Sequence, residues 1–238
     1  MSRTRRLALL GATLLLTTTA LLLSRWQLQR LRQRRESNSA LLAARALPPL
    51  DLTDSSVAPV PGRRLRVHGE FGRGQFALRG RVHDVAPGLE VVTAFRVAGS
   101  EATLWVVRGF VGSPDATTLP QFPQPTAGEV TIEGLALPIP ITADAGQPLV
   151  RGRDTTWRRL DRAVIHQRTP ATYDVYLLLI GEPAGPGQLP PVGPPVLDDG
   201  PHLSYALQWF GIALAIAAFG IISLRRGDPG SVPPRAAP

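Results

Sequence analysis

The chain has 238 residues, enough for one or two domains, and 44% of them are hydrophobic, which excludes a disordered protein. It contains no cysteine, so disulfides, thiolate metal sites and cysteine nucleophiles are excluded. The formal net charge is +8, and every basic side chain is an arginine.

The distribution of this charge argues against a nucleic-acid partner. Residues 1–36 carry eight arginines and one glutamate, and residues 225–238 carry three arginines and one aspartate. The part between them, residues 37–224, has fifteen arginines against sixteen acidic residues and is nearly neutral. Basic clusters beside apolar segments are typical of membrane anchors rather than of a phosphate-binding face.

Two apolar segments are candidates for membrane spans. Residues 7–23 form a run interrupted only by threonine and glycine, and as a helix it measures about 25 Å, near the short limit for a span. Residues 203–224 carry no formal charge and measure about 33 Å. A cleaved signal peptide is the alternative for the first segment. The absence of a small-x-small site before Ser24 and the arginine-rich stretch that follows favour an uncleaved anchor.

The charges that flank the second segment predict its orientation. Arg225 and Arg226 follow it, whereas Asp198 and Asp199 precede it, so the positive-inside rule places the C-terminus in the cytoplasm. Two spans then place the N-terminus on the same side, although the arginines of residues 25–35 lie outside, against the local rule.

The resulting organisation has five parts. A cytoplasmic N-terminus (1–6) leads into a first transmembrane helix (7–23) and an extracytoplasmic domain (24–201). The domain ends in a proline- and glycine-rich linker (181–201) and is followed by a second transmembrane helix (202–224) and a cytoplasmic tail (225–238). The protein is thus expected to be a two-span protein of the cell membrane, in contact with the lipid bilayer.

The extracytoplasmic domain is predicted to be mainly β. Alternating or apolar runs separated by glycine and proline indicate strands at 65–71, 76–82, 89–97, 103–111, 129–137 and 172–180. Residues 155–167 predict one helix, with Thr155 or Thr156 as N-cap and Trp157, Leu160 and Val164 on one face. We therefore expect a small antiparallel β-barrel-like domain with one helix, of the α+β class.

No catalytic motif of an enzyme is present. The chain lacks the nucleophile elbow, the zinc-protease helix motif and the phosphate-binding loop, and it is therefore predicted not to be an enzyme. His68, His83 and His166 are scattered and are interpreted as surface residues of strands or of the helix.

The outer ends of the two spans carry polar and aromatic side chains that a bilayer does not require. His202, Tyr205 and Trp209 share one stripe of a helix, and Trp26 and Arg30 are neighbours on the first helix. Because both ends lie outside, the pairs 26–27 and 208–209 are expected at similar depth. Interfacial aromatic belts and glutamines that join transmembrane helices are the structural alternative.

At these positions the chain resembles the surfeit-locus family of cytochrome c oxidase assembly factors. The resemblance rests on RWQLQR at 25–30, LRVHGEF at 65–71, the strands around VVTAF and LWVVRGFV, and HLSYALQWFGIA at 202–213, in that order. Where family members commonly have tryptophan, this chain has Phe110, which keeps the aromatic body but loses the indole donor.

The resemblance implies a role in inserting or stabilising haem a in subunit I of cytochrome c oxidase. It implies that His202 is the haem-iron ligand, since imidazole is a competent axial ligand. On this reading Tyr205, Trp209 and Trp26 flank the macrocycle, and Arg30 or Arg108 pairs with the propionates. Subunit I is the expected partner, and haem a synthase is a further candidate.

Two other functions are compatible with the sequence. One is a chaperone that binds the oxidase subunit through the strand-rich domain and does not bind haem. The other is a sensor or transport accessory whose outer domain binds a different ligand.

Overall fold

The computed structural model describes residues 2–52, 59–141, 146–152, 154–169, 171–181 and 188–226. The chain divides into two compact units. Residues 1–39 and 197–238 form the first, which we call the helical unit, and residues 40–196 form the second, the sheet unit. The tail after residue 226 and part of the expected linker (182–187) lie outside the described residues.

The two long helices are α1 (Arg3–Ala46) and α3 (His202–Arg226), and each contains an 18-residue window of mean hydropathy 2.0. Both are long and apolar enough to cross a membrane, which indicates a membrane protein. Helix α1 does not end where its apolar run ends at Leu23, because the arginine, glutamine and leucine residues that follow are good helix formers. It ends just before Pro48, a residue that disfavours helical backbone in the residue preceding it.

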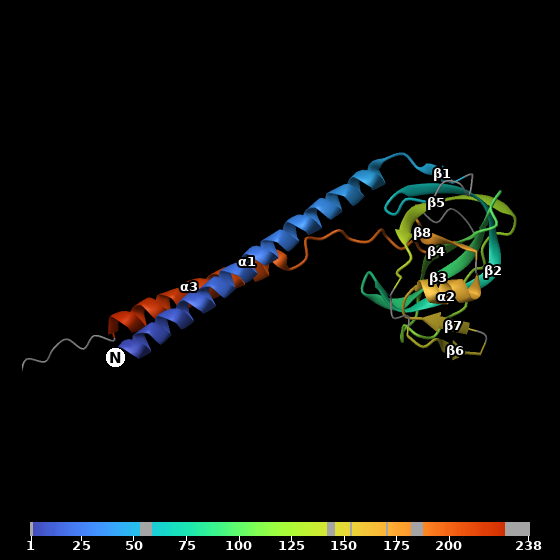
Figure 1. Ribbon diagram of the computed structural model, residues 1–238. Helices are drawn as coiled ribbons and strands as arrows, with labels where there is room; N and C mark the ends of the chain where they lie inside the picture. Colours follow the sequence, from blue (N-terminus) through green and yellow to red (C-terminus); the bar gives the residue numbers. More distant parts are fainter. Residues whose placement is uncertain are drawn as a thin grey trace, which may run out of the picture. The chain divides into compact units, whose positions relative to one another are not determined.

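Helices α1 and α3 lie side by side and run in opposite directions (Figure 1). On the α3 side, their seam is made of small residues: Ala206, Ala213 and Gly220 are buried at intervals of seven residues. The hydroxyl of Ser24 donates a hydrogen bond to the carbonyl oxygen of Ala206 at 2.9 Å. A Cβ atom on Gly220 would lie 2.4 Å from Cγ2 of Thr13, so the helices approach more closely there than any larger side chain permits.

We predict that Gly220→Ile separates the helices, because a branched side chain cannot fit where even a Cβ atom is too close to Thr13. The chain has no cysteine, so a Ser24→Cys/Ala206→Cys pair reports helix contact by disulfide formation under mild oxidation. In that background Gly220→Ile is expected to lower the cross-linked fraction several-fold. Gly211→Ile is the matched control, because a Cβ atom there meets nothing within 4 Å. Equal cross-linking in both variants would contradict a close-packed seam.

Within the described residues, eight strands form one sheet in the sheet unit. They are β1 (Leu50–Leu52), β2 (Arg64–His83), β3 (Ala86–Val97), β4 (Thr103–Gly112), β5 (Glu129–Pro138), β6 (Leu149–Arg151), β7 (Asp154–Trp157) and β8 (Thr172–Leu179). The strands expected at 65–71 and 76–82 are one long strand, β2, with a register shift between Phe71 and Gln75. The other expected strands are present, and each of their ends lies within three residues of the expected one.

The sheet is mixed, so the expectation of a purely antiparallel barrel was wrong about strand direction. β1 and β7 pair with β2 in parallel, and β4 pairs with β8 in parallel, whereas the remaining pairs are antiparallel. Five strands pair in the order β3-β4-β8-β5-β2. The second half of β2 also pairs with β3. Alternation of apolar and polar side chains fixes which face of a strand is buried, but it does not distinguish parallel from antiparallel neighbours.

The helix predicted at 155–167 is present only in the second half of that range. Residues 154–157 form β7, and the helix is the short α2 (Arg162–Arg168), which begins after the N-cap Asp161. The carboxylate of Asp161 accepts a hydrogen bond from the backbone N–H of Ala163 at 2.8 Å. The β-branched Thr155 and Thr156 favour strand over helix, which explains the difference. The side chain of Val164 lies outside the described part of the chain.

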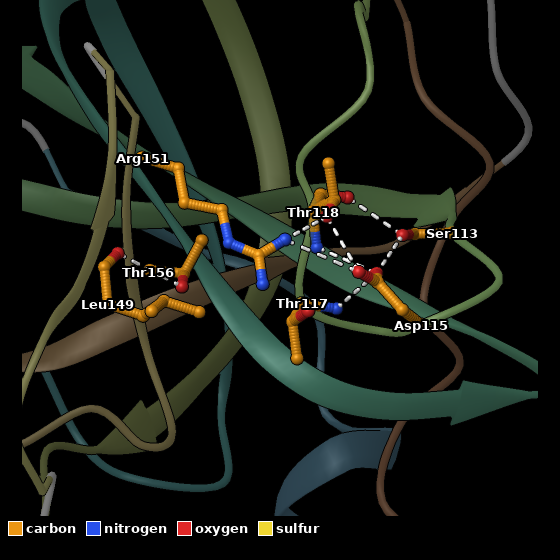
Figure 2. Close-up of polar contacts among 7 residues, drawn as sticks. All are labelled: Ser113, Asp115, Thr117, Thr118, Leu149, Arg151 and Thr156. Atoms are coloured by element: carbon orange, nitrogen blue, oxygen red, sulfur yellow. Dashed lines mark hydrogen bonds and ion pairs between the residues drawn. The ribbon is translucent and has the colours of Figure 1, made fainter.

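The turn after β4 is built around the carboxylate of Asp115 (Figure 2). It accepts hydrogen bonds from the backbone N–H groups of Thr117 and Thr118, at 2.9 and 2.8 Å, and from the hydroxyl of Ser113 at 2.9 Å. Arg151 of β6 forms an ion pair with it at 3.4 Å. The hydrogen bonds from Thr118 and Thr117 hold the pKa of Asp115 well below its usual range.

We predict that Asp115 contributes to the loss of folding stability at acidic pH. Because its folded pKa lies below its unfolded pKa, its contribution is present above the ordinary carboxyl range, about pH 4, and is lost as the pH falls further. Urea midpoints measured by tryptophan fluorescence from pH 7 to pH 3 should fall less steeply in Asp115→Asn than in the wild type. Glu101→Gln removes an exposed carboxylate and should leave the slope unchanged. A wild-type slope in Asp115→Asn would refute this assignment.

Candidate functional site

The residues singled out in the sequence lie in both units. Arg108 belongs to the sheet unit. The others belong to the helical unit: His202, Tyr205, Trp209, Trp26 and Arg30. Within the helical unit the structure joins His202 to a residue of α1, and it joins Trp26 to Arg30.

The imidazole of His202, the first residue of α3, is held by Gln27 of α1. Its Nδ1 lies 2.9 Å from Oε1 of Gln27. Because an amide oxygen only accepts, this contact favours the tautomer in which Nδ1 carries the proton, and in that tautomer the lone pair is on Nε2. A histidine that ligates a metal is commonly oriented in this way, through its other nitrogen, and the bond increases its basicity as a ligand. The sequence places Gln27 at the depth of residues 208–209, but the structure pairs it with His202, at the start of α3.

Gly200 lies in the turn before α3, close to the imidazole of His202. Its φ of +64° lies in the left-handed region, which favours glycine, and a Cβ atom there would lie 3.6 Å from Nε2 of His202. The turn before α3 therefore favours glycine for its backbone, whereas a Cβ atom at this position would make only an ordinary van der Waals contact with the ring.

The aromatic residues of α3 flank His202 along the helix. His202 and Trp209 are partly buried at the edge of the seam, whereas Tyr205 is 46% exposed. The register differs from the expected one, in which Trp26 and Trp209 are level. Because Ser24 meets Ala206 and Gln27 meets His202, Trp209 lies about 9 Å along the helix axis from the level of Gln27.

Trp26 and Arg30 form a second pair, one turn apart on α1. The guanidinium of Arg30 lies over the Trp26 ring at 5.7 Å from its centroid, and it donates a hydrogen bond to Gln33 at 3.3 Å. Trp26 is 47% exposed, so the ring is accessible on the outside of the helix pair.

A polar clamp fixes the segment just before α3 against α1, and sequence analysis did not find it. The side-chain amide of Asn38 donates a hydrogen bond to the carbonyl oxygen of Asp198 at 2.8 Å. Arg35 forms an ion pair with Asp199 at 2.7 Å, and this carboxylate raises the pKa of Arg35. The spacing of Ser24, Gln27 and Asn38 on one face of α1 is the signal that could have indicated it.

Arg108 is a buried residue of β4. Its guanidinium donates a hydrogen bond to the carbonyl oxygen of Pro123 at 3.0 Å and lies over the Phe71 ring at 5.8 Å from the centroid. Burial lowers the pKa of Arg108. It lines a cavity of about 190 Å³ with apolar neighbours that include Phe71, Ile132 and Leu179. The nearby Phe110 is also buried and lies against His83, with ring centroids 5.5 Å apart.

We predict that Gln27 sets the tautomer of His202. In Gln27→Leu the Nδ1–H loses its acceptor, so the population protonated at Nε2 should increase. Nitrogen-15 NMR of histidine-labelled protein in detergent measures this, with the His202 signal assigned by its absence in His202→Ala. Gln29→Leu is the matched control, because Gln29 is exposed. An unchanged His202 spectrum in Gln27→Leu would show that the hydrogen bond does not control the ring.

Comparison with known proteins identifies the family to which the chain belongs. The profile of the SURF1 family matches residues 14–214, which include Gln27 and His202. Uncharacterized SURF1-like proteins of Mycobacterium bovis and Mycobacterium tuberculosis are 29% identical to the chain over 233 residues, covering 89% of this chain and 82% of their own length. The chain therefore belongs to the SURF1 family, known in general for its association with oxidase assembly rather than for catalysis.

Proposed function

We propose that this protein assists the assembly of cytochrome c oxidase by holding haem a at the outer face of the membrane for insertion into subunit I. Membership of the family supports the assembly role. The observation that supports haem binding is the hydrogen bond of 2.9 Å between Gln27 and Nδ1 of His202, because it prepares Nε2 as a ligand.

The residues around His202 fit a haem. When bound, haem would supply an iron that takes a protein ligand and an apolar ring that carries two propionates. Nε2 of His202 would hold the iron, and Gln27 would orient the ring through its contact with Nδ1. Tyr205 and Trp209 offer aromatic surface on the same side of α3.

The propionates need cationic partners near the membrane surface. Arg30 is one candidate, because its guanidinium lies beside the exposed ring of Trp26, which is the third aromatic surface in this proposal. Arg108 stays a predicted partner, and its guanidinium is engaged with Pro123.

The proposed topology places both termini in the cytoplasm. The spans are 7–23 and 202–224, and residues 24–201 are extracytoplasmic. Arg3, Arg5 and Arg225 flank the cytoplasmic ends in accordance with the positive-inside rule. In this arrangement haem received from haem a synthase reaches subunit I without leaving the low-dielectric zone of the bilayer.

We predict that protein purified from cells that make haem a carries haem, seen in its absorption spectrum, and that His202→Ala loses it because no other nitrogen replaces the axial ligand. His68→Ala is the matched control, since His68 contacts Thr131 and Glu129 in the sheet unit. Thermal unfolding of His202→Ala checks that the variant is folded. A colourless wild type that still rescues oxidase activity would overturn the proposal and support a chaperone that does not bind haem.

A further inference from the structure

Four of the arginines that follow the apolar part of α1 divide into two groups. Arg34 and Arg35 face Asp198 and Asp199, with ion pairs of 3.7 and 2.7 Å. Arg25 and Arg32 are exposed, and in the described part of the chain neither forms an ion pair. Charge within the helical unit therefore accounts for the first group and leaves the second unexplained.

Arg25 and Arg32 share an exposed flank of α1, next to the face that packs against α3. They are seven residues apart and so lie almost in line along the helix. Ser24 and Leu31, which precede each of them by one residue, are buried, whereas Gln29, between the arginines, is exposed.

The same face is apolar in the turns that lead up to Arg25. Leu14 is 70% exposed, Leu21 is 43% exposed and Thr18 between them is exposed. These positions alternate at intervals of three and four residues, which keeps them in line with Arg25 and Arg32. The stripe thus changes from apolar to cationic at Arg25. A ligand that matches it has an apolar chain and an anionic head.

We propose that this stripe binds an anionic phospholipid, with its phosphate at Arg25 and Arg32 and an acyl chain along Leu14 and Leu21. Guanidinium groups form strong charge-assisted hydrogen bonds with phosphate oxygens. A soluble anion would not use the apolar half of the stripe. Glu36, four residues after Arg32, places a carboxylate beyond the arginines and limits the site on that side. The inference rests on α1 crossing the bilayer and is independent of haem binding.

Native mass spectrometry of the delipidated full chain in detergent tests the proposal with two probes, phosphatidylglycerol and phosphatidylcholine. The wild type should prefer phosphatidylglycerol by roughly thirtyfold, the value expected for two arginines at a membrane surface. Arg25→Gln/Arg32→Gln should lose this preference. Arg158→Gln/Arg159→Gln is the control, because it removes the same charge from exposed positions of the sheet unit. Glycerol phosphate, which has no acyl chain, should not compete at equal concentration.

Several outcomes would overturn the proposal. Equal binding of the two lipids by the wild type, or an unchanged preference in Arg25→Gln/Arg32→Gln, would show that the stripe does not select anionic lipid. Full competition by glycerol phosphate would make it a site for a soluble anion. If the double variant keeps its lipid preference but no longer binds purified oxidase subunit I, the stripe is a protein-docking face instead.

Discussion

The close seam between α1 and α3 is the constraint on which the candidate site depends. Gly220 and Ala206 leave space for the backbones to approach, and Thr13 and Ser24 fill it. Apolar surface gives helices little reason to associate in lipid, so close packing and interhelical hydrogen bonds must supply the attraction. Only at this separation can the side chain of Gln27 span the seam to His202. The position of the imidazole therefore depends on how the seam residues pack.

The clamp beyond the apolar region makes the register of the two helices definite. A run of small residues alone would permit sliding, because one small residue packs much like the next. Asn38 bonded to Asp198 and Arg35 paired with Asp199 fix the start of α3 at one level of α1. His202 follows a few residues later, so its ring meets Gln27 and no neighbouring turn. Backbone positioning and side-chain orientation are thus set by different groups of residues.

The sequence predicted element types better than element limits or partners. Hydropathy located both apolar segments, but it reports where a lipid environment ends and not where a helix ends, so the continuation of α1 to Ala46 was missed. Alternation located β3, β4 and β5 but carried no information on strand direction. In the site, His202 was found by its unusual position at the start of an apolar helix. Its partner Gln27 was not, because pairing depends on a register that only packing determines.

The antiparallel packing of α1 and α3 separates two questions: whether the site is assembled, and on which side of the membrane it lies. Counting arginines around α1 alone gives one orientation, and counting them around α3 gives the other. The clamp shows that the residues after the apolar part of α1 and those before α3 lie together. If both helices cross the bilayer, Gln27 and His202 are therefore on one side whichever side that is. The arginines after Leu23 then bear on which side carries the site, and not on whether the site is assembled. Two of them are neutralised by Asp198 and Asp199, so the local conflict with the positive-inside rule is smaller than a count of arginines implies.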